Sequence, residues 1–219
     1  MLAYQLIQQT FPSLHLTDKV GFALQLMDEY DVQHLPIINE EKFIGSVAKD
    51  DLLDVDDTHL LATLEDSFIK ASIKKEEFIL GALKIVTENE LTVLPVVNEL
   101  DELQGTISII ILLQNIAKYL GTNEQGGIIV LEVERRNFSF GEISRLVETN
   151  DAYITQLNTY TEAETGLIIV SLKVNKVEIS DILATFQRYD YLVRYYFGEE
   201  QFANELKENY NHLMAYLNL

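Results

Sequence analysis

The chain of 219 residues contains no cysteine. It can therefore form no disulfide bond, and it offers no thiolate ligand to a metal ion. Disulfides are typical of secreted proteins, so their absence leads us to expect a cytoplasmic protein. The N-terminal residues, MLAYQLIQQTF, have neither a basic region nor a small-residue cleavage site, and they do not resemble a secretion signal.

Basic residues and long apolar runs are also scarce. Lysine and arginine number 16 against 35 acidic residues, which gives a formal net charge of −19. Because binding to a polyphosphate backbone needs a basic footprint, we expect no nucleic-acid partner and no binding to anionic membranes. The longest apolar run, residues 107–113, is interrupted by Ser108 and is far shorter than the roughly 20 residues that span a bilayer.

The local motifs of common catalytic and metal sites are missing. No P-loop, GxGxxG or GxSxG string occurs. The acidic run that begins at Asp50 has Val55 and Leu61 where a calcium-binding EF-hand loop needs glycine and glutamate, so we interpret it as a solvated acidic helix end and linker. The four histidines, at positions 15, 34, 59 and 212, show no metal-ligand spacing. We expect no catalytic residue, no metal site and no enzymatic activity.

What the sequence does contain is an internal duplication. The stretch LPIINEEKFIGSVAKDDLL, residues 35–53, returns as LPVVNELDELQGTISIIILL, residues 94–113. The Leu-Pro pair and the following Asn recur at an offset of 59, and Gly45 recurs at Gly105, an offset of 60. Self-similarity at a fixed period indicates repeated structural units.

Hydrophobic spacing predicts a mixed α/β (α+β) fold. Each repeat has the pattern β-α-β-β-α, with a helix over residues 1–11 at the start and a further helix beginning at 49–53 after the first hairpin. A glycine-rich linker, 121–127, separates the repeats from a segment with the order β-α-β-β-α-β, which is the ferredoxin-like arrangement. Such a sheet carries both helices on one face, so its other face needs a cover.

Two apolar features follow at the end of the chain. An amphipathic helix is predicted for 199–219, packed on its own domain or against a second copy, from a stripe formed by Phe202, Leu206, Tyr210, Leu213 and Leu217. A second group is interpreted as one aromatic cluster on a sheet surface that a partner chain buries, and its members are Tyr189, Tyr191, Tyr195, Tyr196 and Phe197.

The duplicated pattern resembles a pair of CBS (cystathionine-β-synthase-type) domains, a Bateman module, over residues 1–122, with repeats at about 1–57 and 58–122. The ferredoxin-like segment, 127–198, resembles an ACT domain, with NFSFGEI (137–143) at the position of the Asp/Asn…Gly loop, although Phe140 replaces the usual proline. The order CBS–CBS–ACT is similar to bacterial acetoin-utilisation regulatory proteins.

This resemblance implies a sensor and not a catalyst. CBS pairs bind adenine nucleotides between their halves, so AMP, ADP, ATP or S-adenosylmethionine is the implied ligand, with no permanent cofactor. The residues that the resemblance places at the nucleotide are His34, Pro36, Asp51, Pro95 and Ser108. ACT domains bind amino acids, and the corresponding effector residues are Arg136, Asn137 and Gly141. A homodimer and a regulated partner enzyme complete the expected interactions.

The binding motif itself is incomplete in both repeats. Ligand-binding CBS domains begin the helix after the glycine with Ser or Thr, followed three residues later by Asp. The first repeat has Ala48 and Asp51 at these positions, and the second has Ser108 and Ile111. An apolar Ile111 would leave ribose hydroxyls unpaired, so the first cleft is the better nucleotide candidate. The alternative is a dimerisation or docking scaffold whose clefts have lost their ligand.

Single residues also leave alternatives open. His34 could stack on a base or be a half-buried structural histidine. Arg136, next to Arg135, could receive a ligand carboxylate by bidentate pairing, or it could lie at an exposed strand end.

Overall fold

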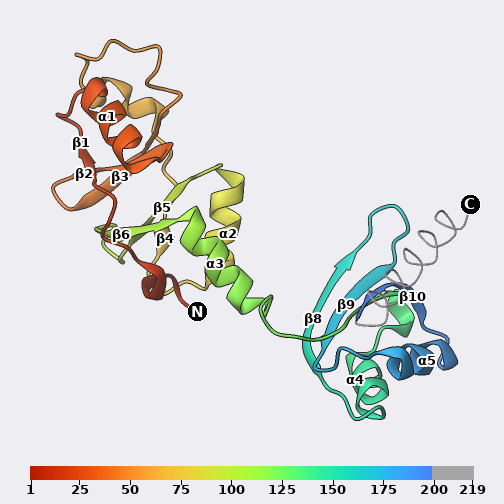
Figure 1. Cartoon of the computed structure of the whole chain (residues 1–219). Coiled ribbons are helices and arrows are strands. Elements are labelled where there is room, and N and C mark those ends of the chain that lie inside the picture. Colours follow the sequence, from red (N-terminus) through yellow and green to blue (C-terminus); the bar gives the residue numbers. More distant parts are fainter. Residues whose placement is uncertain (199–219) are drawn as a thin grey trace, which may run out of the picture. The chain divides into compact units, whose positions relative to one another are not determined.

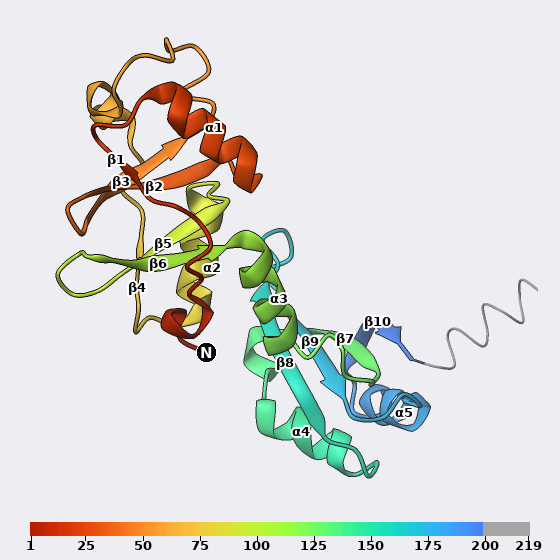
Figure 2. The same cartoon turned by 60° about the vertical axis from the view of Figure 1, so that its left-hand side comes forward.

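A computed structural model describes residues 1–198 of the protein. The chain divides into two compact units, Met1–Tyr119 and Leu120–Leu219, and each is described by itself. Figure 1 and Figure 2 show the elements of both units from two directions. The amphipathic helix predicted for 199–219 lies outside the described residues.

The first unit contains two copies of the same small sheet. The first copy consists of β1 (Leu14–His15), α1 (Val20–Tyr30), β2 (His34–Asn39) and β3 (Lys42–Ala48), and its sheet has the order β1-β2-β3. The second copy consists of β4 (Ile73–Lys74), α2 (Ile79–Glu88), β5 (Val93–Val97), β6 (Leu103–Ser108) and α3 (Ile109–Tyr119), with the order β4-β5-β6. Both hairpins have a shift of register at equivalent positions, between Ile37 and Ile38 and between Val96 and Val97. The predicted duplication is therefore confirmed, including this irregularity of the strand pairing.

Two helix predictions in this unit are wrong. The predicted helix over 1–11 is only the short 3₁₀-helix η1 (Ala3–Leu6). The helix expected at 49–53 is a series of turns, which a second 3₁₀-helix, η2 (Leu61–Ser67), follows. The Asp-rich run KDDLLDVDD has one fully buried apolar residue, Leu52, and therefore has too small an apolar stripe to stabilise a helix.

The repeats exchange the segments that precede them. The N-terminal residues Ala3 and Leu6 lie in the buried core of the second repeat, and Phe68, just before the second repeat, lies in the core of the first. Each segment adds a short antiparallel pairing, Gln8 with Thr106 and Ile69 with Ser46, at equivalent places in the two sheets. The repeats are therefore interlocked parts of one unit.

Equivalent residues of the repeats also pair with one another. Lys42 forms a bridge with its counterpart Glu102, and two symmetric backbone bonds flank it, from Phe43 N–H to Asp101 at 2.9 Å and from Leu103 N–H to Glu41 at 2.9 Å. Equivalent residues can pair in this way only on the axis that relates the copies. The two repeats thus surround a pseudo-two-fold axis.

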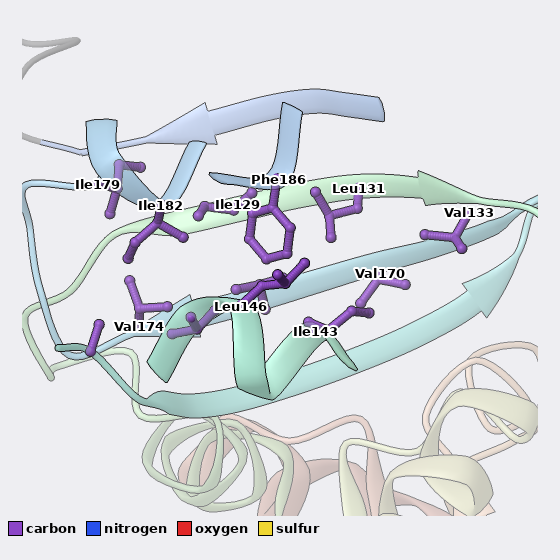
Figure 3. Close-up of a cluster of buried hydrophobic side chains, with 13 residues drawn as sticks. Ile129, Leu131, Val133, Ile143, Leu146, Val170, Val174, Ile179, Ile182 and Phe186 are labelled. Atoms are coloured by element: carbon purple, nitrogen blue, oxygen red, sulfur yellow. The ribbon is translucent and has the colours of Figure 1, made fainter. Parts of the chain in front are cut away.

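The second unit has the predicted ferredoxin-like order. Its elements are β7 (Ile128–Val133), η3 (Arg135–Asn137), α4 (Phe140–Glu148), β8 (Ile154–Thr161), β9 (Ile168–Val174), α5 (Ser180–Arg188) and β10 (Leu192–Phe197). The antiparallel sheet has the order β10-β7-β9-β8. Its core lies between the sheet and the two helices, around the fully buried Phe186 (Figure 3).

Candidate functional site

His34 joins the two repeats near the pseudo-two-fold axis. Only 8% of the residue is exposed, and its Nδ1 accepts the backbone N–H of Thr92 at 3.3 Å. The hydroxyl of Thr92 lies 3.2 Å from the same nitrogen and accepts the N–H of Gln33, the equivalent of Thr92 in the first repeat, at 3.1 Å. Burial lowers the pKa of His34, while the charges of Asp50 and Asp51 raise it by a smaller amount. The residue is thus a structural histidine, and it is close enough to the acidic turn of the first repeat for the charges of Asp50 and Asp51 to act on it.

Asp51 lies in that turn and is exposed. Because no helix begins after β3, this position lacks the free N–H groups and the positive helix end that attract a phosphate. The backbone of Lys49 is fixed by a bond from its N–H to the carbonyl of Gln33 at 2.8 Å, and its ammonium pairs with Asp28. The structure brings Asp51 near His34 but supplies no phosphate cradle beside it.

Ser108 is the counterpart of Ala48 in the second repeat, and there a helix does begin. Its Oγ accepts the N–H of Ile111 at 3.3 Å and lies 3.1 Å from Oε1 of Gln8. Ser108 is therefore the N-cap of α3, and its oxygen is already engaged in two contacts within the unit.

Pro36 and Pro95 are buried strand residues. Pro36 is opposite Ser46, and Pro95 is opposite Thr106. Each lies in the middle strand of its sheet, but β1 and β4 are only two residues long and pair beyond the proline. The missing proline N–H thus leaves no strand bond unmade, which explains how proline is tolerated in a central strand.

A cavity of about 410 Å³ lies between the repeats at the hairpin end of the strands, away from His34 and Ala48. Its lining was not predicted from the sequence, because it needs the exchanged segment and both hairpin turns together. The lining residues are Gln9, Phe11, Ser13, Ile38, Glu40, Glu41, Glu102, Leu103, Gln104, Gly105 and Thr106.

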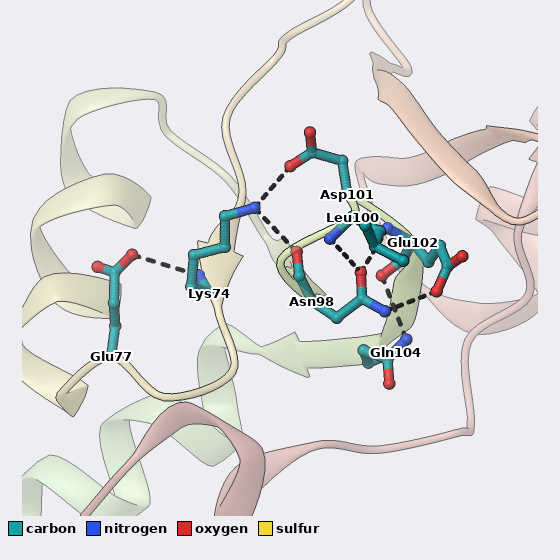
Figure 4. A network of polar contacts seen from close by, with 7 residues as sticks. All are labelled: Lys74, Glu77, Asn98, Leu100, Asp101, Glu102 and Gln104. Atoms are coloured by element: carbon teal, nitrogen blue, oxygen red, sulfur yellow. Dashed lines mark hydrogen bonds and ion pairs between the residues drawn. The ribbon is translucent and has the colours of Figure 1, made fainter.

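A polar network fixes the second hairpin beside this cavity (Figure 4). Lys74 donates to the carbonyl of Asn98 at 2.8 Å and to Asp101 at 2.6 Å. The side chain of Asn98 accepts the N–H groups of Leu100 and Glu102, both at 2.9 Å, and closes the turn. The hydrogen bond between Lys74 and Asp101 raises the pKa of the lysine and lowers that of the aspartate, so both remain charged near neutral pH.

The second unit has a cavity of about 650 Å³ at the predicted effector loop. Arg136, Asn137 and Ser139 line it, whereas Gly141 is exposed in the first turn of α4 and is not part of the lining. The other residues of the lining are Glu132, Val133, Glu134, Phe138, Glu142, Leu167, Tyr189, Asp190, Tyr191 and Leu192.

The charges around this cavity are mainly negative. The guanidinium of Arg136 is 80% exposed and already pairs with Glu134 at 2.6 Å. Tyr191 donates its hydroxyl to Glu142 at 3.2 Å, and burial, with the charge of Glu142, raises the pKa of this tyrosine to about 12. A ligand carboxylate would meet four acidic side chains and one neutralised arginine.

The described residues hold neither a metal-binding group nor a membrane span. Among residues 1–198 there is no cluster of three or more His, Cys, Asp or Glu side chains that could hold a metal ion. Within the same range, every helix is too short or too polar to cross a membrane.

A family model and one solved structure with a TM-score above 0.5 agree with the fold of the first unit. Residues 3–57 match the model of the CBS domain family. The crystal structure of a CBS domain pair/ACT domain protein from Thermotoga maritima is 26% identical, with a TM-score of 0.51, over 55% of this chain and 99% of that one. A Vibrio cholerae protein named for acetoin utilization (AcuB) is 20% identical over 56% of this chain and 95% of its own, with a TM-score of 0.47.

Proposed function

Because this chain contains a CBS domain at residues 3–57 and carries its structural copy in the same unit, we propose that it is a regulatory protein without catalytic activity. In this proposal the CBS pair, residues 1–122, binds an adenine nucleotide, and the ACT-like domain, 127–198, responds to a second metabolite. The observation that carries the proposal is the pseudo-two-fold interlocking of two CBS-type repeats, since a ligand between them can favour one packing over another.

The proposal assigns the nucleotide to the strand ends around His34, Asp51 and Ser108, between the walls formed by Pro36 and Pro95. Isothermal calorimetry of the full chain with AMP, ADP, ATP and S-adenosylmethionine tests it. We expect one of these to bind, and Asp51→Asn to weaken that binding at least tenfold. Asp54→Asn is the matched control in the same exposed turn and should bind as the wild type does. Absence of heat and of thermal stabilisation with all four ligands would contradict nucleotide sensing.

The second ligand is assigned to the cavity of about 650 Å³ at Arg136 and Asn137. Its size suits an amino acid or another small metabolite. Asn137→Ala should abolish a thermal shift that an amino-acid panel produces, whereas Gly141→Ala, outside the lining, should retain it. A shift that survives Asn137→Ala and is lost in Gly141→Ala would place the effector elsewhere.

A docking scaffold is the second candidate function. The occupied hydroxyl of Ser108, the apolar Ile111 and the turn that follows β3 favour it, because together they leave neither repeat with a complete phosphate and ribose site. This reading predicts a homodimer that retains a partner enzyme stoichiometrically in a pull-down from native lysate, with or without nucleotide. A partner that binds only when nucleotide is added would favour the sensor instead.

A further inference from the structure

The cavity of about 650 Å³ in the second unit is lined by apolar and acidic side chains. A cavity of this size is typical of a small-molecule site. The apolar part of the lining consists of Val133, Phe138, Leu167 and Leu192, with the rings of Tyr189 and Tyr191. The acidic part consists of Glu132, Glu134, Glu142 and Asp190. The contacts that these acidic groups already make decide which charge a ligand should carry.

The two features that could attract a ligand carboxylate are already occupied by acidic side chains. Arg136, in the lining, pairs with Glu134 at 2.6 Å. At the N-terminal end of α4, the hydroxyl of Ser139 accepts the N–H of Glu142 at 3.3 Å, and the carboxylate of Glu142 lies in the same turn, so the positive end of the helix is compensated. A free carboxylate, which every amino acid carries, would have to displace an internal acidic group from either position.

Of the remaining three carboxylates, only that of Glu132 has a cationic partner among residues 1–198. Its Oε1 lies 2.5 Å from Nε of Arg194. Glu142 accepts the hydroxyl of Tyr191 at 3.2 Å, and within the described part of the chain neither Glu142 nor Asp190 takes part in an ion pair. The lining therefore keeps a surplus of two negative charges, which a cationic ligand would compensate.

The aromatic residues near the end of the second unit form two groups, which corrects the prediction of one aromatic sheet surface. Tyr189 and Tyr191 precede β10 and line the cavity. Tyr195, Tyr196 and Phe197 lie on β10 and take no part in this lining. The predicted cluster is therefore wrong as regards its membership, and two of its rings belong to the candidate ligand site.

We infer that the second ligand of the proposed function, on which this step rests, is a small organic cation without a carboxylate: an amine or a guanidinium on an apolar body. Glu142 and Asp190 pair with its cationic groups, and the apolar side chains contact its body. The hydroxyl of Tyr191 holds the carboxylate of Glu142 in place. The ring of Tyr189 already accepts one guanidinium, that of Arg145, which lies outside the lining at 5.5 Å from the ring centre.

Three pairs of probes isolate the effect of the carboxylate in the full chain. Agmatine, cadaverine and tyramine differ from arginine, lysine and tyrosine only by its absence. Isothermal calorimetry should show at least one of the amines bound once per chain and about tenfold more tightly than its parent amino acid. If every amine binds as weakly as its parent or more weakly, the inference is overturned. The proposed second-ligand site itself fails only if the whole amino-acid panel and the amines give no response.

Asp190→Asn tests whether the amine binds in this cavity, and Asp151→Asn, outside the lining, is the matched control. Both aspartates are exposed, follow a helix and have a positive φ, of 60° and 52°, which Asn also adopts, so both variants should fold. Each variant removes one charge from a chain of net charge −19, so nonspecific attraction falls equally in both. We expect about tenfold weaker binding only in Asp190→Asn. Equal affinities in the two variants would overturn the inference.

Glu142→Gln tests the second carboxylate in the same way. Gln keeps an oxygen that can accept the hydroxyl of Tyr191, so the variant removes the charge and retains this contact. Glu148→Gln is its control, because Glu148 is exposed in the last turn of α4, also accepts a hydroxyl, that of Ser144 at 2.8 Å, and is not part of the lining. We expect weaker amine binding in Glu142→Gln alone, and an equal loss in both variants would contradict the assignment of Glu142.

Discussion

At the scale of single residues, the two glycines of the duplication make room for the exchanged segments. A Cβ built at Gly45 would lie 2.7 Å from Cβ of Phe68, and one built at Gly105 would lie 2.5 Å from Ile7. Gly105 also has a φ of +138°, which L side chains rarely adopt. Glycine recurs at this position because, in each repeat, the segment that precedes the other repeat packs against it.

Replacing these glycines should destabilise the first unit. Gly45→Ala should lower the free energy of unfolding by about 1–3 kcal/mol through overpacking, and Gly105→Ala by more, because backbone strain adds to the clash. Chemical denaturation measures both. Gly81→Ala is the control within α2, where an added Cβ has ordinary contacts, and it should stabilise the unit by about 0.5–1 kcal/mol. Equal effects at all three sites would contradict the close approach.

Ser46 shows how the repeats differ at one equivalent position. Its hydroxyl is completely buried and has no hydrogen-bond partner, whereas Thr106 donates to the carbonyl of Gln8 at 3.5 Å. Ser46→Ala should therefore raise the free energy of unfolding by about 1 kcal/mol, because it removes an unsatisfied polar group. Thr106→Val should lower it by about 0.5–1.5 kcal/mol. A loss of stability in Ser46→Ala would reveal an unseen partner for this hydroxyl.

His34 makes stability depend on pH. Because its pKa is lower in the folded state than the ordinary 6.5, the unfolded chain binds a proton more readily. The stabilising contribution is complete above pH 6.5 and is lost as the pH falls toward the folded-state pKa. Urea denaturation at a series of pH values should show this fall in the wild type, and a shallower one in His34→Gln. If the free energy of unfolding falls with pH equally steeply in both proteins, the buried ring of His34 does not have the lowered pKa that its burial causes.

At the scale of elements, the sequence pattern predicts strands and helices, which depend mainly on residues close together in the chain. The predicted β-α-β-β-α-β order of the segment 127–198 agrees with the structure, because alternation and helical spacing are strong there. The turn after β3 was missed, because the repeat suggested a helix that the acidic residues of 49–57 do not stabilise. Segment exchange, the hairpin-end cavity and the pairing of Lys42 with Glu102 could not be predicted, since each joins parts of the chain that the local pattern does not relate, such as Gln8 with Thr106.

Two substitutions of Ser108, in the first turn of α3, distinguish a role in helix capping from a role in ligand binding. Ser108→Ala should destabilise the unit by about 1 kcal/mol through the lost cap, whereas Ser108→Asp should keep the cap and the stability. If a phosphate binds at this helix end, Ser108→Asp should also abolish nucleotide binding by charge repulsion, which calorimetry would detect. Unchanged affinity in Ser108→Asp would remove this helix end from the nucleotide site.

At the scale of the whole molecule, the two units have separate buried cores. Among residues 1–198, the fully packed members of the core around Phe186 lie between Ile129 and Phe186, with Tyr191 and Val193 of the same unit packed against them. The two cores of the first unit, in contrast, share residues across the repeats, such as Val93 in the core of the first repeat. The repeats should therefore unfold together, and the second unit should unfold on its own.

Core substitutions test this independence in the full chain. Phe186→Ala should destabilise the second unit by about 3–5 kcal/mol, and Leu94→Ala the first by about 2–5 kcal/mol, because each removes a fully buried side chain. Hydrogen exchange followed by segment should show faster exchange only in 128–197 for the first variant and only in 1–119 for the second. If either variant accelerates exchange throughout the chain, the units unfold as one, and a ligand in one would stabilise the other by the same coupling.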